Sequence, residues 1–150
     1  GLDSLMQYYV HQLSGDEHLI LDAIKSHFHH FKGILPYITA ADPDSLETIG
    51  KGIERGITVT APGFYAPQGR QVRAKASFPG LIDDIRSFSA GKHRITNLEM
   101  ETAGIYALSR VLGHKALSVN AILASRLKFQ FAPNPAKIIK QAIERVLSRL

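Results

Sequence analysis

The sequence of 150 residues contains no cysteine. This absence excludes a disulfide scaffold, a thiolate zinc site and a cysteine nucleophile. The sequence also has no apolar run near the roughly 20 residues that a membrane-spanning helix needs. Its first residues do not form the basic segment and apolar core of a signal peptide. We therefore expect a cytoplasmic protein that has no membrane partner.

Basic residues exceed acidic ones only mildly, with 18 lysines and arginines against 13 aspartates and glutamates and a formal charge of +5. Such an excess suits an anionic substrate or nucleic acid and does not choose between them. The basic residues of the last stretch, 135–150, surround a regular apolar face, which favours packing on a core over binding of nucleic acid. We therefore expect no nucleic-acid partner.

The length of the chain and its apolar content of 45% favour one globular domain, residues 1–150. Apolar residues recur at helical and strand spacings in alternation. The spacings predict helices over 16–32, 44–55, 79–88, 99–112 and 135–150, strands over 34–40, 57–60 and 115–124, and loops over 64–70 and 125–134. This alternation is typical of an α/β protein, and the nearly continuous apolar strand 115–124 indicates a sheet covered on both faces. The predicted fold is three-layered, with a mixed sheet flanked by helices.

Two acids, Glu99 and Glu101, stand at the start of the fourth expected helix. Acids in a first turn offset the helix dipole by about 0.3–1 kcal/mol, and Thr96 or Asn97 would then be the cap. Alternatively, both acids bind a ligand. Positions i and i+2 do not share a helical face, so one acid would then lie on the approach and one at the helix start. Carboxylates there suit sugar hydroxyls, which need acceptors.

The loop 64–70 carries side chains that suit a flat, polar heterocycle. Phe64 offers a ring face, Gln68 one acceptor and two donors, and Arg70 a rigid cationic fork. The alternative is a plain surface loop built from proline, glycine and glutamine. Arg126 follows the expected strand 115–124, and ligand sites in open α/β sheets lie outside the carboxyl ends of strands. A solvated arginine is an equal alternative there.

Histidines gather near the N-terminus but do not have the spacing of a metal site. The five are His11, His18, His27, His29 and His30. A helical metal site favours a pair at i and i+4, and no acid completes a set around these residues. We therefore expect them to be packed or solvated and to hold no metal.

The loop and the acidic run together form a motif that resembles that of a known family. The pattern is Phe64-x-x-x-Gln68-x-Arg70, followed some thirty residues later by the run 97–101, Asn-Leu-Glu-Met-Glu. It resembles the nucleoside phosphorylase family and, within it, the uridine phosphorylases. The later elements also follow that family's order, so the resemblance covers nearly the whole chain. It implies a phosphorylase-like α/β fold.

The resemblance implies a role for each residue at the base. Phe64 would pack against uracil and ribose. Gln68 would bond the O2/N3 edge of uracil, and Arg70 its O4 side. Arg126 would support the base site. Ser125 stands where purine-cleaving relatives carry an aspartate and pyrimidine enzymes tend to have asparagine, so purines are not expected as substrates.

The resemblance also implies the ribose site and the reaction. Met100 would lie along the ribose, Glu101 would accept a hydrogen bond from its 2′-hydroxyl, and Glu99 would shape the pocket. Phosphate would attack the anomeric carbon of uridine and give uracil and ribose 1-phosphate. Arg70 and Glu101 would be the catalytic residues. Phosphate is the co-substrate, and no metal or organic cofactor is implied.

The family builds its phosphate site in an N-terminal half that these 150 residues do not contain. The resemblance therefore implies that the chain is the C-terminal portion of one phosphorylase-like domain, incomplete at its N-terminus and inactive alone. The complete protein would be a homo-oligomer, either a dimer or a hexamer built of dimers. The alternative is a non-catalytic nucleoside-binding or interaction module. A basic nucleic-acid-binding domain is a weaker alternative, because no aromatic and basic strand pattern supports it.

Overall fold

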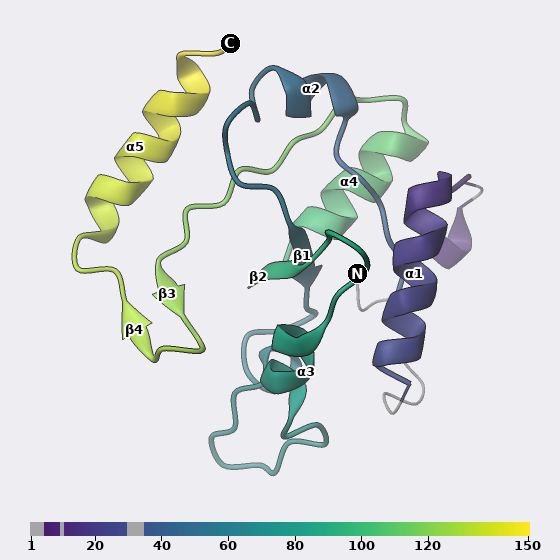
Figure 1. Cartoon of the computed structure of the whole chain (residues 1–150), viewed down its shortest axis with the longest axis vertical. Coiled ribbons are helices and arrows are strands. Elements are labelled where there is room, and N and C mark those ends of the chain that lie inside the picture. The colour runs from purple at the N-terminus through teal and green to yellow at the C-terminus, as the bar shows by residue number, and fades with distance from the viewer. Residues whose placement is uncertain (1–4, 10, 30–34) are drawn as a thin grey trace. The chain divides into compact units, whose positions relative to one another are not determined.

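The computed structural model describes residues 5–9, 11–29 and 35–150 (Figure 1). These residues form two compact units. The first comprises the described residues up to Ala40 together with Arg55–His114, and the second comprises Ala41–Glu54 together with Lys115–Leu150. The mixed α/β class is confirmed. The prediction of one domain over residues 1–150 stays a prediction.

The first unit alternates helices with two parallel strands. Its elements are the 3-10 helix η1 (Leu5–Tyr8), α1 (Gly15–His27), β1 (Ile57–Thr60), the 3-10 helix η2 (Ala66–Gln68), α3 (Leu81–Ser87), β2 (Ile95–Glu99) and α4 (Thr102–Val111). β1 consists of β-branched residues, which favour a strand. It pairs with β2, and Thr60 stands opposite Glu99. Because the strands are parallel, both end at the same edge of the pair.

The N-terminal half of this unit is held to α4 by one buried carboxylate. Glu17 is only 4% exposed, and it accepts hydrogen bonds at 2.8 Å from the backbone N–H groups of both Ser14 and Ala40. Arg110 on α4 donates to the same carboxylate at 2.5 Å. Ser14 in turn caps α1 in a reciprocal capping box. Glu17 therefore joins three segments that are far apart in the sequence.

The buried face of α4 supplies much of the core. Small residues at Ala103 and Ala107 let the helix approach closely, and the cluster that they form is completed by Met6, Tyr37 and the partly buried Leu5 and Val111. Two apolar side chains on α4, Ile105 and Leu108, are instead 54% and 39% exposed, and the C-cap residue Leu112 is 65% exposed. α4 is thus apolar on more than its buried side.

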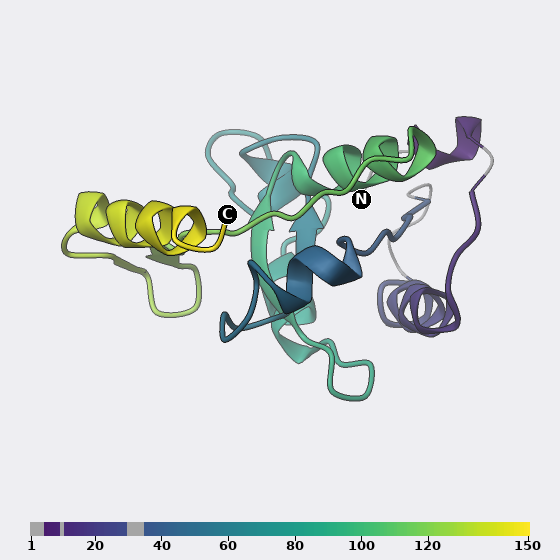
Figure 2. The ribbon, with the colours of Figure 1, turned by 90° about the horizontal axis from the view of Figure 1, so that it is seen from above.

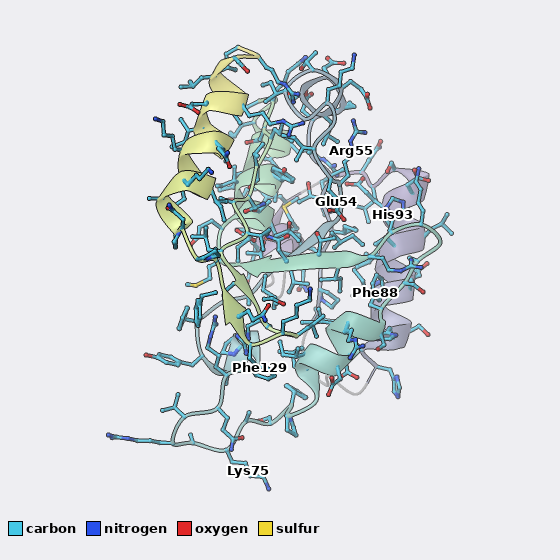
Figure 3. The ribbon with its side chains drawn as sticks, turned by 60° about the vertical axis from the view of Figure 1, so that its left-hand side comes forward. Glu54, Arg55, Lys75, Phe88, His93 and Phe129 are labelled. Carbon is cyan, nitrogen blue, oxygen red and sulfur yellow. The ribbon has the colours of Figure 1, made fainter. Side chains whose placement is uncertain are left out.

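Among the described histidines, His27 packs against α3. The Nε2 of His27 lies 2.8 Å from the carbonyl oxygen of Asp84, and its ring meets that of Phe88 edge-on at 5.5 Å. Phe88, labelled in Figure 3, is 1% exposed at the end of α3. No group of three or more metal-binding side chains occurs within residues 5–9, 11–29 and 35–150. His30 lies outside the described residues.

The second unit contains α2 (Pro43–Glu47), β3 (Ala124–Ser125), β4 (Gln130–Phe131) and α5 (Pro135–Leu147). β3 and β4 form a short antiparallel pair, and Phe129 lies in the turn between them (Figure 3). α5, yellow in Figure 2, follows this hairpin. Arg145 and Arg149 each donate to a backbone carbonyl of the segment after α2, at 2.6 Å. The basic residues of α5 therefore serve in part to hold this unit together.

Two strand predictions are wrong. Residues 115–123 form no strand, and only Ala124–Ser125 of the expected strand pairs, with β4. Residues 35–40 likewise form no strand, while residue 34 lies outside the described residues. A strand needs a regular series of hydrogen bonds to a neighbouring strand. The backbone contacts of 115–123 are instead isolated ones, from the N–H of Asp42 to the carbonyl of Ala116 at 3.0 Å and from the N–H of Ala132 to the carbonyl of Leu123 at 2.8 Å. The expected loop 125–134 in turn contains β4.

The helix predictions hold better at the ends of the chain than in the middle. α1 and α5 lie where expected, and the predicted end of the first helix falls partly outside the described residues. α2 is much shorter than the expected 44–55. The predicted start of the helix 99–112 is too early, because residues 95–99 form β2 and α4 begins at Thr102. Among the described residues no helix has the length and apolarity to cross a membrane, and the cytoplasmic location stays a prediction.

Candidate functional site

The two segments of interest both start at the edge where β1 and β2 end. After Thr60 the chain enters the loop that leads to residues 64–70, and after Glu99 it turns into α4. The backbone N–H of Ala61 donates to the Glu99 carbonyl at 2.9 Å, so the two exits start side by side. This edge is where parallel α/β sheets place ligands.

Within the loop, the structure brings together the three side chains that the sequence singled out. The guanidinium carbon of Arg70 lies 3.8 Å from the centroid of the Phe64 ring, a cation–π contact. Nη1 of Arg70 donates at 2.6 Å to Oε1 of Gln68 and at 2.5 Å to the carbonyl of Phe64. Phe64 is 52% exposed, whereas Gln68 is 6% exposed. The loop is therefore an ordered cluster, with its ring toward solvent and its amide buried.

The Arg70 contact orients the amide of Gln68. Because Oε1 of Gln68 accepts from Arg70, the amide nitrogen is the end of the group that remains to donate to a ligand. The following residue, Gly69, has a φ of +69°, and a Cβ there would lie 2.9 Å from Cγ1 of Ile82. Glycine thus lets the loop turn tightly against α3. Beyond it, residues 71–75 are exposed, and Lys75 extends into solvent (Figure 3).

Of the two acids, Glu99 is engaged within the protein. One of its carboxylate oxygens accepts from the hydroxyl of Thr60, and the other accepts at 2.7 Å and 2.6 Å from the backbone N–H groups of Glu101 and Thr102. Thr60 itself accepts from the N–H of Ala103 at 2.9 Å. The predicted caps, Thr96 and Asn97, are wrong, because both residues belong to β2. Glu99 instead holds the start of α4 from the strand.

Glu101 and Met100 form the exposed part of this turn. Met100 is 42% exposed, and Glu101 is exposed at the N-cap position of α4 without capping the helix with its side chain. The carboxylate of Glu101 accepts from the N–H of Met100 at 3.2 Å. Glu99 thus lies before the helix and Glu101 at its start. The spacing of the two acids required this arrangement if both were to bind a ligand.

Arg126 belongs to the second compact unit, just after β3. Its predicted role beside Gln68 and Arg70 stays a prediction. The neighbouring Ser125 accepts from the N–H of Lys128 at 3.2 Å and so stabilises the turn of the hairpin.

Sequence reasoning missed Thr60. Its side chain is 5% exposed and uses its hydroxyl both to donate and to accept. The available signal was modest: a threonine as the last residue of a β-branched strand, directly before a proline- and glycine-containing turn.

The pKa of Glu99 is lowered. Burial by itself raises the pKa of this carboxyl, but the hydrogen bonds from Thr60 and from the N–H groups of Glu101 and Thr102 outweigh burial. The pKa of Glu17 is lowered in the same way: burial raises it, and the hydrogen bonds from Arg110, Ser14 and Ala40 outweigh burial. Both carboxylates, in their ionised form, therefore stabilise the folded state.

Stability should fall in mild acid. Glu17 and Glu99 have folded-state pKa values below their ordinary value of 4.5. Their contribution is fully present above about pH 4.5 and is lost as the pH falls through the lowered values. We expect the urea midpoint of unfolding to drop steeply between pH 5 and pH 3, and to drop less in Glu17→Gln. An equal slope in the variant would contradict the assignment to Glu17.

The fold is thus that of an α/β protein with its polar site at the edge where parallel strands end. The chain belongs to the phosphorylase superfamily, whose family model matches residues 18–150. The predicted membership of a nucleoside phosphorylase family is confirmed.

Two known proteins are similar to this chain. The uridine phosphorylase of Thermococcus kodakarensis is 35% identical over 98 residues, which cover 63% of this chain and 33% of the relative. A crystal structure of a Trypanosoma brucei nucleoside phosphorylase, described as showing uridine phosphorylase activity, matches with a TM-score of 0.80 and 24% identity and supports the fold. That match covers 99% of this chain and 54% of the trypanosomal one. The chain therefore spans between about a third and about half of the length of these relatives.

Proposed function

We propose that the protein catalyses the phosphorolysis of a pyrimidine nucleoside, converting uridine and phosphate to uracil and ribose 1-phosphate. The observation that carries this proposal is the Phe64, Gln68 and Arg70 cluster at the strand edge from which the Glu99–Glu101 turn also starts. One segment suits a flat base and the other suits a sugar, as a nucleoside requires.

The cluster suits a departing uracil. As the glycosidic bond breaks, negative charge moves onto the base and its carbonyl oxygens. Arg70 supplies a fixed positive charge, and the amide nitrogen of Gln68 supplies a donor. Donors fixed before the reaction stabilise charge where it develops in the transition state. Phe64, half exposed, offers its ring to the flat face of the substrate.

The acidic turn suits the ribose. In phosphorolysis the sugar gains positive charge as its bond to the base lengthens. The exposed carboxylate of Glu101 can accept from a ribose hydroxyl and hold the ring in place. Met100, also exposed, can lie along the apolar side of the sugar. Arg70 and Glu101 are the two catalytic residues of this proposal, and Glu99 shapes the turn. The role of Arg126 at the base stays a prediction from the sequence.

We assign the phosphate-binding groups to sequence outside these 150 residues. A dianion needs several donors and cations, and the loop and turn described above are already committed to base and sugar. The relatives are two to three times as long as the matched part, which leaves room for such groups. The exposed apolar residues of α4 support packing against further chain or a second copy, in line with the proposed homo-oligomer.

The test uses the protein as its gene encodes it. Uridine and phosphate should give uracil and ribose 1-phosphate, separated by chromatography, whereas adenosine and inosine should give no product. Absence of product from every nucleoside would overturn the proposed function. Cleavage of the purines alone would overturn the pyrimidine assignment.

The 150-residue chain alone provides the second measurement. Calorimetric titration should show that it binds uridine equally with and without phosphate, and that it produces no uracil. If the gene-encoded protein also binds uridine without turning it over, the non-catalytic nucleoside-binding module becomes the better description. The observation that favours that alternative is the short span of the match.

A further inference from the structure

We propose that Thr60 is a positioning residue for ribose recognition, because it caps α4 from the neighbouring strand and so leaves the Glu101 side chain available to the sugar. The proposal rests on the proposed function for its ligand. Its geometry stands independently of that function.

The first N–H groups of a helix have no partner within the helix, and the N-cap side chain usually accepts from one of them. In α4 the N-cap residue is Glu101, yet its side chain makes no capping hydrogen bond. Three successive N–H groups, those of residues 101–103, are instead satisfied from outside. Glu99 accepts from the first two, and Thr60 accepts from the third at 2.9 Å.

Thr60 links these two caps. Its hydroxyl donates to Glu99 while accepting from Ala103, so one buried group serves both partners. The register of β1 and β2, which sets Thr60 opposite Glu99, makes this possible. The amide at position 103 is the position that an N-cap side chain ordinarily reaches. The Thr60 hydroxyl therefore accepts the hydrogen bond from the Ala103 N–H that the Glu101 side chain would otherwise accept.

Removal of the Thr60 hydroxyl should cause the Glu101 side chain to cap α4. In Thr60→Val, which keeps the shape of the side chain, Ala103 N–H and Glu99 lose their buried partner. An unsatisfied buried donor is costly, and Glu101 is the N-cap residue, whose side chain ordinarily accepts from an amide at this position of the helix. A Glu101 that caps α4 no longer points at the sugar. Recognition of ribose should suffer, and recognition of the base should not.

The test compares uridine with uracil as ligands of the gene-encoded protein. We expect Thr60→Val to weaken uridine binding by roughly tenfold, about the loss of one hydrogen bond to a charged group. Uracil affinity should stay within about twofold. Thr60→Ser, which restores the hydroxyl, should bind both ligands like the unchanged protein. An equal loss for uridine and uracil, no loss at all, or a serine variant as weak as the valine variant would each overturn the proposal.

A structural readout separates this proposal from the proposed function. A crystal structure of ligand-free Thr60→Val should place a Glu101 carboxylate oxygen within hydrogen-bond distance of the Ala103 N–H. Glu101 in its present position would overturn the proposal, whichever ligand the protein binds. If the unchanged protein binds neither uridine nor uracil, the proposed function fails while this readout still applies. Should Thr60→Val not fold, Thr60→Ala is expected to show the same displacement.

Discussion

Replacing Arg70 with alanine should lower kcat/KM for uridine by about 10²–10³-fold, the usual cost of removing one fixed donor to a developing negative charge. The effect is expected to be large because Arg70 does two things at once. It supplies the positive charge beside the base, and it orders the loop by contacting the Phe64 ring at 3.8 Å and Gln68 at 2.6 Å. The measurement is steady-state formation of uracil by the gene-encoded protein.

Two further variants control for charge and for folding. Arg73→Ala removes a cation from the exposed segment three residues further along and should leave the rate unchanged. Arg70→Lys keeps the charge but loses the planar fork, and should recover only part of the rate. Far-ultraviolet circular dichroism should be the same for all three variants. Normal turnover by Arg70→Ala would refute the role assigned to Arg70.

Replacing Glu17 with alanine should destabilise the first unit by about 3 kcal/mol, since it removes one partner of a buried ion pair and one half of a capping box. Arg110 keeps 29% of its side-chain surface in solvent, which limits the cost of leaving its charge unpaired. With a urea m-value of about 2 kcal/mol/M, the midpoint of unfolding should fall by roughly 1.5 M.

Asp22→Ala is the matched control for Glu17. It removes an acid from the same helix, but from an exposed position, and alanine is the better helix former there. Its midpoint should change little. A Glu17→Ala midpoint no lower than that of Asp22→Ala would show that the carboxylate does not join α1, Ala40 and α4 as described.

The sequence predicted correctly those elements whose residue pattern is contained within the element itself. β1 is correct because its residues are β-branched, and α5 is correct because its apolar residues recur with a helical period. β2 was missed because Asn97 and Glu99 fit a helix start equally well. Only pairing with β1 makes residues 95–99 a strand. The prediction for residues 115–123 was wrong in the opposite way: their apolar composition favours a strand, but the structure assigns no strand to them.

In the candidate site, too, contacts within one segment were predictable and contacts between distant segments were not. The juxtaposition of Phe64, Gln68 and Arg70 was predictable because all three lie within seven residues of one loop. The spacing of Glu99 and Glu101 indicated that the two acids could not share a helical face, but it did not predict that Glu99 ends a strand. The contribution of Thr60 could not be predicted, since it depends on a register between strands whose partners, Thr60 and Glu99, are 39 residues apart.

The parallel pairing of β1 with β2 also fixes when the site can exist during synthesis. The hydrogen bond from Ala103 to Thr60 closes a span of 43 residues. At about 5–20 residues per second, a ribosome needs roughly 2–9 s to add that span. Until residues 95–99 are added, β1 is already made but has no β2 to pair with, and long-range closure is the slow part of folding. For these seconds the nascent chain holds the β-branched segment Ile57–Thr60 without its β2 partner, so slower translation lengthens the time for which this segment can meet a chaperone or associate with another chain.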